Sequence, residues 1–498
     1  MKNLFLIVIT LPFLLFCSTK KQSEQLSQPG PYFGNGIHNG WVDQTSVTIW
    51  TRLTENPEMN WEGTEFIPIT REQEKEYAKI TNEAELHSKQ IPEGLTLNDM
   101  EGACPGAEGE VQLTYYPDGN VEGKVKLDWA KVDANKNYTT QWKLENLEPG
   151  TKYLMEIYSR ADENQSNGDT IRGSFVTAPA AEARGDIAFS VISCHDYIRR
   201  DSTTGHRIYP AMAADNLDFF VHTGDIEYYD KPNPYAMTEP MMRLKWDRLF
   251  ALPLQRDFYS TTSGYFMKDD HDILRDDAYP GMTYGTVSFD RGVEIFDKEQ
   301  FPTNDKTYKT IRWGKDLQVW ILEGRNYRSK NTDPDGPGKT ILGKEQKQWL
   351  FSTIDASDAT YKVIISSSPI LGPDRPKGKN DNYSNQAFAY EGNEIREFIN
   401  GHENVFLCTG DRHWQYVSHF EGTNLWEFSC GAGSDSHAGG WSQDNVKPEH
   451  RFLRVKGGYL YGRVYNDDEG PKLRFEHRDV NGKVMHQEEF SRAPSAIL

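Results

Sequence analysis

Cysteine is scarce in this chain of 498 residues, which contains only Cys17, Cys104, Cys194, Cys408 and Cys430. A small exported domain that relies on disulfides has a much higher density of cysteine. A disulfide scaffold is therefore excluded, although one disulfide among the last four cysteines is allowed. The chain is longer than a single hydrophobic core accommodates, which predicts two domains.

Long apolar runs are also missing, apart from one near the N-terminus. Residues 4–16 are apolar, follow the basic start Met-Lys-Asn and are too few to span a bilayer. They end at Cys17, and this arrangement resembles a bacterial lipoprotein signal, in which the cysteine is acylated, although Phe16 stands where a small residue is usual. We therefore expect a lipoprotein-type signal peptide at residues 1–17 and a tether at 18–30. The alternative is an ordinary signal peptide cut nearby.

The chain has fewer basic than acidic residues, with 55 Lys and Arg and 74 Asp and Glu, and its formal net charge is -19. Nucleic acids and anionic membrane surfaces carry the same sign, so we expect no nucleic-acid binding. We expect contact with a membrane only through the lipid anchor, at the periplasmic or outer surface of a bacterial cell envelope. A surplus of carboxylates is also what a protein needs to hold several cations.

The first part of the chain, before residue 180, has sequence patterns typical of β-strands. Residues 47–53 alternate and are rich in β-branched side chains, and residues 153–158 form a second strand-like run. The connector at residues 147–153, Leu-Glu-Pro-Gly-Thr-Lys-Tyr, resembles the corner of fibronectin type III domains, in which the tyrosine hydroxyl closes a strand connection. We therefore expect a fibronectin type III-like β-sandwich over residues 31–180, interrupted by a polar insert from about 55 to 133 to which the sequence assigns no role.

The pattern changes to α/β after the linker at residues 180–185. Several apolar runs have the composition of buried strands and are separated by helical or irregular stretches. These runs lie at residues 188–192, 219–221, 317–322, 363–365 and 405–407. The sequence predicts an α/β layered domain over residues 185–498.

Acidic and other metal-ligating residues follow three of the apolar runs. Two runs stop at a Gly-Asp pair, which places Asp225 and Asp411 at the carboxyl edge of a sheet, where open α/β folds bind ligands. A third run ends in Ser-Cys194-His, and Asp-Asp-His271-Asp lies between the two Gly-Asp pairs. Any one of these segments alone is more simply a solvated turn. Together they favour a metal site.

The order and the residue types of these segments resemble those of the PhoD-like alkaline phosphatases, a branch of the calcineurin-like metallophosphoesterases. The resemblance extends from about residue 32 to at least residue 418. It rests on five motifs: Ser193-Cys194, Gly-Asp-x-x-Tyr at 224–228, Asp-Asp-His-Asp at 269–272, Leu-Glu-Gly-Arg-Asn-Tyr-Arg at 322–328 and Gly-Asp-x-His-Trp at 410–414. It implies a metallophosphoesterase fold for the second domain.

The resemblance also implies roles for individual residues. The expected metal ligands are Cys194, Asp225, Tyr228, Asp270, Asp411 and His413. Asp225 would bridge two ions, and His271 would face the scissile phosphate as a hydrogen-bond donor or leaving-group acid. Arg325 and Arg328 would bind phosphate oxygens, Arg325 also taking part in catalysis. Read without the resemblance, Tyr228 is a packed aromatic and the arginines are ordinary surface residues.

Thiolate and phenolate donors favour ferric iron, and the resemblance implies Fe³⁺ together with Ca²⁺, with other divalent metals as alternatives. The chain departs from the family pattern in four places: His195 replaces Gln, Lys268 an aromatic residue and Glu323 an aspartate, while Asp276-Asp277 stands in place of an Asn-bearing element. We expect residues 431–437 to form a plain surface loop; the alternative is a flexible loop near the mouth of the site, with His437 as a further polar contact.

These observations predict a monomeric, metal-dependent hydrolase of phosphate esters, an alkaline phosphatase D-like phosphomonoesterase or phosphodiesterase that uses a metal-bound hydroxide or oxide. The residues are compatible with monoesters and with diesters. The alternative from another class is a cell-surface binding protein whose metal site is only structural, but such sites close their coordination shells and need neither His271 nor the arginines.

Overall fold

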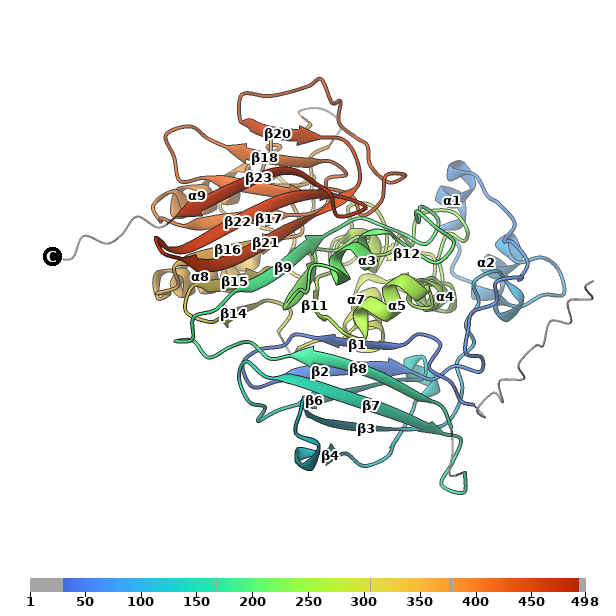
Figure 1. Ribbon diagram of the computed structural model, residues 1–498. Coiled ribbons are helices and arrows are strands. Elements are labelled where there is room, and N and C mark those ends of the chain that lie inside the picture. The colour runs from blue at the N-terminus through green and yellow to red at the C-terminus, as the bar shows by residue number, and fades with distance from the viewer. Residues whose placement is uncertain (1–29, 166–167, 305, 376–378, 492–498) are drawn as a thin grey trace, which may run out of the picture.

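The computed structural model describes residues 30–165, 168–304, 306–375 and 379–491 (Figure 1). Cys17, the predicted signal peptide and nearly all of the predicted tether lie outside these residues, so the lipid anchor stays a prediction. The four other cysteines are free and buried, which means that the disulfide allowed by the sequence does not form. None of the described helices combines the length and apolar character that crossing a bilayer requires.

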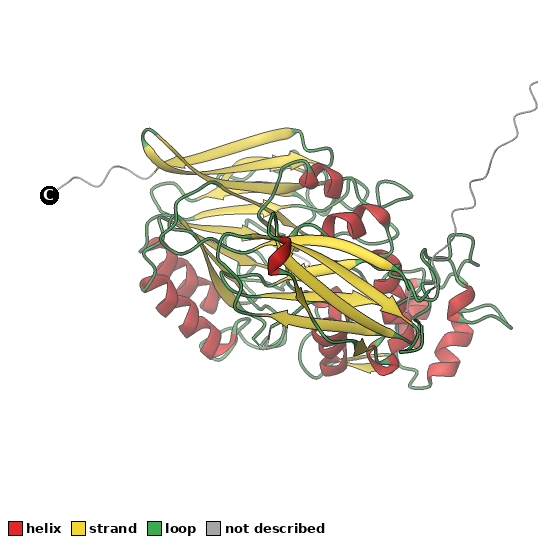
Figure 2. Ribbon diagram, turned by 60° about the horizontal axis from the view of Figure 1, so that its bottom comes forward, coloured by secondary structure: helices red, strands yellow, loops and turns green. Residues whose placement is uncertain are grey.

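The N-terminal region is an antiparallel β-structure arranged as a sandwich (Figures 1 and 2). One layer contains β1 (Ile37–Gly40), β2 (Val47–Arg52) and β6 (Thr139–Leu144); the other contains β3 (Glu110–Pro117), β4 (Val125–Lys126), β5 (Ala130–Lys131), β7 (Lys152–Arg160) and β8 (Thr170–Val176). Buried side chains such as Ile49, Leu113 and Ile157 pack between the layers. The Tyr153 hydroxyl accepts a hydrogen bond from the backbone N–H of Glu148 at 2.9 Å, as the corner motif predicts.

The interruption of the sandwich is shorter than the sequence suggested. It contains α1 (Arg71–Tyr77), α2 (Glu83–Gln90) and the 3₁₀ turn η1 (Leu97–Asp99), and ends before β3. β3 pairs with β7 along its whole length, from Glu110 opposite Arg160 to Pro117 opposite Tyr153. The expected insert therefore included a strand of the sandwich, whose alternating buried residues Val111 and Leu113 were hidden in a polar stretch. The 3₁₀ turns η2 (Val121–Gly123) and η3 (Ala134–Lys136) also lie in this stretch.

The two predicted regions share one sheet. Its strands follow the order β23-β22-β21-β9-β10-β11-β1-β2-β6, and the central strands are β9 (Ile187–Ile192), β10 (Phe219–His222) and β11 (Ser263–Phe266). β11 meets β1 in parallel at Gly40 and Gly264, where a Cβ on Gly40 would lie 2.8 Å from the Gly264 carbonyl oxygen. This close approach requires glycine and joins the sandwich to the α/β region.

A second sheet has the order β14-β15-β16-β17-β19-β18-β20. Its strands are β14 (Lys309–Trp313), β15 (Leu317–Ile321), β16 (Tyr361–Ser366), β17 (Val405–Thr409), β18 (Gln415–His419), β19 (Trp426–Cys430) and β20 (His450–Arg454). It packs face to face with the first sheet through residues that include Phe189, Phe219, Trp313 and Phe428. The five apolar runs predicted as buried strands correspond to β9, β10, β15, β16 and β17.

Helices cover the outer faces of both sheets. The helices beside the first sheet are α3 (Ile208–Ala213), α4 (Glu239–Phe250), α5 (Pro253–Tyr259), α6 (Asp270–Ile273), α7 (Phe289–Glu294) and the π-helix η4 (Ile295–Gln300). Those beside the second sheet are α8 (Gly343–Asp355) and α9 (Ala389–Asn400). The small hairpin of β12 (Thr283–Tyr284) and β13 (Val287–Ser288) lies beside them. The predicted layered α/β architecture is therefore present.

Three C-terminal strands complete the first sheet and were not expected from the sequence: β21 (Gly458–Asp467), β22 (Gly470–Asp479) and β23 (Val484–Ser491). β21 pairs antiparallel with β9, so the three C-terminal strands extend the sheet beside the strand that leads to Cys194. Four strands, β9, β10, β11 and β17, thus end close to the loops that carry the candidate ligands.

Candidate metal centre

Three of the candidate ligands lie on tight turns with unusual backbone angles. Cys194, Asp225 and Asp411 have φ values of 46°, 55° and 61°, in the left-handed region that residues with a Cβ rarely adopt. The glycines before two of them are required by close packing: a Cβ on Gly224 would lie 2.6 Å from the Asp269 Cβ, and one on Gly410 would lie 2.1 Å from the Thr223 hydroxyl oxygen. Backbone strain of this kind concentrates at functional sites.

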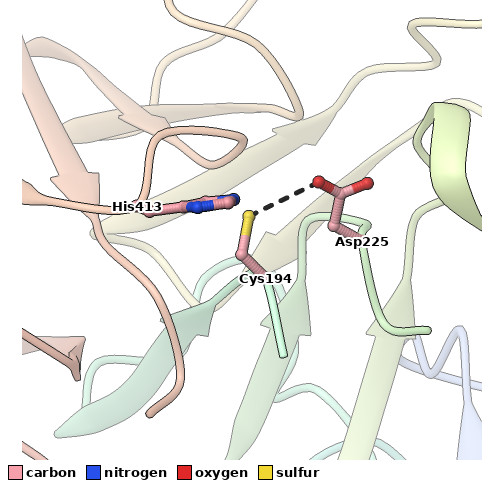
Figure 3. A group of neighbouring side chains, drawn as sticks. All are labelled: Cys194, Asp225 and His413. Atoms are coloured by element: carbon pink, nitrogen blue, oxygen red, sulfur yellow. Dashed lines mark hydrogen bonds between the residues drawn. The ribbon is translucent and has the colours of Figure 1, made fainter. Parts of the chain in front are cut away.

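The first group of ligand atoms comes from Cys194, Asp225 and His413 (Figure 3). The Cys194 Sγ lies 3.6 Å from the Asp225 Oδ2, and His413 approaches from the other sheet. The Tyr228 hydroxyl lies 2.9 Å from the same Asp225 oxygen and 3.2 Å from the His413 Nε2. The structure therefore brings together the thiol, carboxylate, phenol and imidazole that the sequence proposed as metal ligands.

Two further groups share Asp225. One combines it with Asp270 and His271, and the other with Asp269 and Asp411. Asp411 reaches the centre from a left-handed turn. Because Asp225 contributes to every one of these groups, it occupies the position that a carboxylate bridging two cations requires.

The electrostatics of the centre suit bound cations. Burial raises the pKa of the Cys194 thiol and of the Tyr228 phenol well above their usual values, and the carboxylate of Asp225 reinforces both shifts. Burial also raises the pKa of Asp225, and its Oδ1, like the Asp269 Oδ2, has no hydrogen-bond partner among the described residues. Bound cations would supply the missing partner and favour the deprotonated ligands, so these residues fit the metals that the resemblance implies.

His271 is held by a carboxylate. Its Nδ1 lies 2.6 Å from Asp230 Oδ1 in a pocket where the ring is 8% exposed. Burial alone would lower the pKa of His271, but Asp230, Asp225 and Asp270 outweigh it and raise the pKa to about 10. The raised pKa favours the protonated imidazole, the form that a group protonating a leaving alcohol must have. No local motif in the sequence pointed to Asp230.

The two arginines differ in their surroundings. Arg325 donates through Nε to Asp269, and its Nη2 lies 3.5 Å from Asp270 Oδ1, so both bonds tie it to the carboxylate cluster. Arg328 donates through Nη2 to the backbone oxygen of Asp381, while its buried Nε and Nη1 lack partners among the described residues. Of the two, Arg328 has buried donors without a partner among the described residues, and Arg325 contacts the carboxylates of Asp269 and Asp270.

Asp272, the last residue of the Asp-Asp-His-Asp motif, is a structural clamp. Its carboxylate accepts the backbone N–H groups of Asp225 at 2.6 Å, Ile226 at 2.8 Å and Asp269 at 2.8 Å. It therefore fixes the loop after β10 against the loop after β11. The only signal for this role was its place three residues after Asp269, where it completes a capping box at the start of α6.

His437 is not on the surface, contrary to the expectation from the sequence. Its side chain is 3% exposed and its ring packs 4.4 Å from that of His413 and 5.0 Å from that of Tyr228. The loop is held by hydrogen bonds such as those from Gly433 N–H to the carbonyl oxygens of the Ser193-Cys194 turn, both at 3.0 Å. The glycines and serines of residues 431–437 are typical of an exposed loop. The loop is buried because it packs against the Ser193-Cys194 turn, which is far away in the sequence.

Asp276 and Asp277 form a fourth acidic group with Asp270. Lys379 lies 2.8 Å from Asp276, so a cation from the protein already faces these carboxylates. The Asp277 N–H also donates to Asp270 Oδ2 at 2.6 Å, which holds this pair against the ligand loop.

Comparison with known proteins bears on the whole arrangement. The sequence profile of the PhoD-like phosphatase family matches residues 296–465, which contain Arg325, Arg328, Asp411 and His413. The chain is 24% identical to alkaline phosphatase D of Bacillus subtilis (strain 168), in an alignment that covers 58% of this chain and 59% of that relative.

Two solved structures share the fold. The structure of PhoD superimposes with a TM-score of 0.70 at 18% identity, covering 94% of this chain and 91% of the other. A purple acid phosphatase from yellow lupin (Lupinus luteus) seeds superimposes with a TM-score of 0.58 at 11% identity, covering 92% and 74%. The resemblance to the PhoD-like phosphatases recognised from the motifs is confirmed by these comparisons, and the fold is that of PhoD and purple acid phosphatase.

Proposed function

We propose that this protein is a metal-dependent hydrolase of phosphate esters. The observation that carries the proposal is Asp225, a buried carboxylate with an unpartnered oxygen that contributes to three candidate metal groups. A structural metal site needs a closed set of ligands and nothing more. Here a cationic His271 and the free donors of Arg328 lie at the same centre, as binding and cleaving a phosphate ester would require.

Each group has a separate task in this proposal. Cys194, Tyr228 and His413 would hold one cation with Asp225, while Asp270 and Asp411 would complete the remaining coordination. The bound cations would supply Lewis-acid polarisation of the phosphoryl oxygens and an activated water.

The chain's own side chains bind the substrate and move the proton. Arg328 binds a phosphoryl oxygen through Nε and Nη1, and Arg325 keeps Asp269 and Asp270 in place. His271, held through Nδ1, donates a hydrogen bond from Nε2 and transfers that proton to the leaving oxygen.

Hydrolysis of chromogenic esters tests the function. Purified protein should release 4-nitrophenol from 4-nitrophenyl phosphate, from bis(4-nitrophenyl) phosphate or from both, and elemental analysis should find bound metal. The ratio of the two rates assigns the monoester or diester preference. A protein that binds its metals but hydrolyses neither ester would favour the surface-binding alternative.

The first ligand group best suits Fe³⁺, and the carboxylates of the other two groups suit Ca²⁺. Thiolate and phenolate donors favour ferric iron, whereas carboxylate oxygens suit calcium. The purified protein should therefore be coloured, because thiolate or phenolate bound to Fe³⁺ absorbs visible light. We expect Cys194→Ser and Tyr228→Phe each to shift or bleach this band and to lower activity, and a calcium chelator to inactivate the wild type reversibly.

Cys430→Ser is a suitable control for this experiment. Cys430 is a buried thiol at the end of β19, but it belongs to none of the candidate metal groups among the described residues. Its replacement should leave the band unchanged. A colourless, iron-free and fully active wild type would rule out the ferric assignment and leave ester hydrolysis untouched.

Two finer features belong to the same proposal. The Tyr153 corner and the strand pairing support a fibronectin type III-like module at residues 31–180. We expect the protein to act as a monomer on small-molecule esters, exported and anchored by lipid at the periplasmic or outer surface of the cell envelope.

The anchor predicts a specific N-terminus. The mature protein should begin at an acylated Cys17 and partition with membranes, and Cys17→Ala should abolish lipidation and release the protein into the soluble fraction. Mass spectrometry of native protein checks this directly. An unmodified N-terminus beyond Cys17 would rule out the anchor.

A further inference from the structure

The helices that interrupt the sandwich contact the loop that follows β10. The Gln90 amide and the Tyr235 backbone exchange two hydrogen bonds, at 2.8 and 2.9 Å, and His87 Nε2 lies 2.9 Å from the Thr238 hydroxyl oxygen. In Figure 1, α1 and α2 lie in blue at the side of the helices that cover the first sheet. Residues 55–109, which the sequence left without a role, are therefore docked on the segment that begins at Tyr228.

One contact reaches closer to the centre. Arg71, the first residue of α1, donates through Nη1 to the backbone oxygen of Asp230 at 3.1 Å, and its Nη2 lies 3.7 Å from Asp230 Oδ2. Glu74, one turn later and buried, lies 3.2 Å from Arg71 Nη1 and holds the guanidinium in this direction. Helix α1 is itself fixed by a complete capping box between Thr70 and Gln73.

Asp230 connects this arginine to the catalytic histidine. Its Oδ1 lies 2.6 Å from His271 Nδ1, while its Oδ2 faces Arg71 and accepts the Asp276 N–H at 3.3 Å. A second cation, Lys231, lies 3.9 Å from Oδ1 with its side chain partly exposed. Arg71, whose side chain is 41% exposed, and Lys231 are thus ion-pair partners of the carboxylate, and the Asp276 N–H is a hydrogen-bond donor to it. The direction of the imidazole depends on how firmly these groups hold the carboxylate.

We infer that Arg71 is a positioning residue for His271 and acts through Asp230, which makes the inserted helices part of the catalytic apparatus. This inference rests on the proposed function. With Asp230 held by Arg71, the imidazole keeps one orientation and its Nε2 proton stays aligned with the leaving oxygen. Without Arg71, Asp230 retains Lys231 and the backbone, so the histidine stays in place but is less well aligned.

The consequence is selective for the leaving group. A nitrophenolate leaves readily without a proton, whereas an alkoxide does not, so imprecise proton donation slows only the second reaction. With an alkyl ester of the class that the wild type hydrolyses, Arg71→Ala should lower kcat by about tenfold, a part of the usual general-acid contribution. With the 4-nitrophenyl ester, kcat should stay within about twofold, and KM should not change for either ester.

Matched variants separate positioning from folding. Arg71→Lys keeps a cation beside Asp230 and should recover most of the alkyl-ester activity. Lys75→Ala removes a positive charge from an exposed position of the same helix and should behave as the wild type. Metal content should be the same in all variants, because Arg71 contacts none of the candidate ligands directly.

Three results would overturn the inference: equal losses with both esters, wild-type rates in Arg71→Ala, or loss of metal in that variant. A wild type that hydrolyses no phosphate ester would instead overturn the proposed function. The two failures are therefore distinguishable in one set of measurements.

Discussion

Asp225→Asn should abolish hydrolysis. The substitution removes the carboxylate that three of the candidate metal groups share, and with it the negative charge that offsets the repulsion between neighbouring cations. Asn is nearly isosteric and tolerates the left-handed backbone found at this position, so the turn itself should be retained. We expect a folded protein with lowered metal content and activity reduced by at least about a hundredfold, since removal of a strong electrostatic contribution has this size.

The matched control is Asp257→Asn. Asp257 is an exposed aspartate on α5 whose side chain is 74% accessible. Its replacement changes the net charge by the same amount and should change neither activity nor metal content. Near-wild-type hydrolysis by Asp225→Asn would show that Asp225 bridges nothing essential, and the assignment of the centre would then be wrong.

The parts of this centre that the sequence predicted are those encoded locally. An apolar run that stops at Gly-Asp contains in a few residues the strand, the turn and the ligand, as at Gly224-Asp225. The glycine is needed because Asp269 packs against it. The strands β10 and β17 were therefore placed correctly, and the aspartates that follow them reach a common centre.

The parts that were missed depend on contacts between distant segments. β21 pairs with β9 although most of the α/β region lies between them in the sequence, and the residues of neither strand identify the other as its partner. Asp230 has no motif around it, and its role follows only from its contact with His271. Pairing and side-chain contacts over such separations are set by tertiary packing, which local patterns do not record.

Two departures from the family pattern compensate for one another. Lys268 replaces an aromatic residue and Glu323 replaces an aspartate, and the structure places the lysine Nζ 2.6 Å from the glutamate Oε2 in a buried site that also contains Asp297. Glu323 Oε1 accepts the N–H of Arg325 at 2.7 Å, so the pair supports the arginine loop. Read one at a time in the sequence, these substitutions cast doubt on the site, whereas as a buried pair they preserve it.

His271→Ala should lower hydrolysis of esters with poor leaving groups by about two or more decades, the usual contribution of a general acid. Asp230, Asp225 and Asp270 raise the pKa of His271, which favours its protonated form, and the contact with Asp230 fixes the direction of the ring. The loss should be much smaller with a 4-nitrophenyl ester, whose leaving group needs no proton. Rates measured over a series of leaving groups, with metal content determined in parallel, check both statements.

His271→Asn and His402→Ala complete the experiment. Asn keeps a hydrogen-bond donor but cannot transfer a proton, so it should retain the metals and the fold while failing with poor leaving groups. His402 lies at the end of α9 and pairs with Asp355 at 2.9 Å, away from the centre, and its replacement should leave activity unchanged. If His271→Ala lost metal and folded structure together, or slowed all esters equally, the histidine would be a structural residue. Because its Nδ1 is held by Asp230 while its ring packs 4.2 Å from that of Tyr228, the geometry favours the catalytic role.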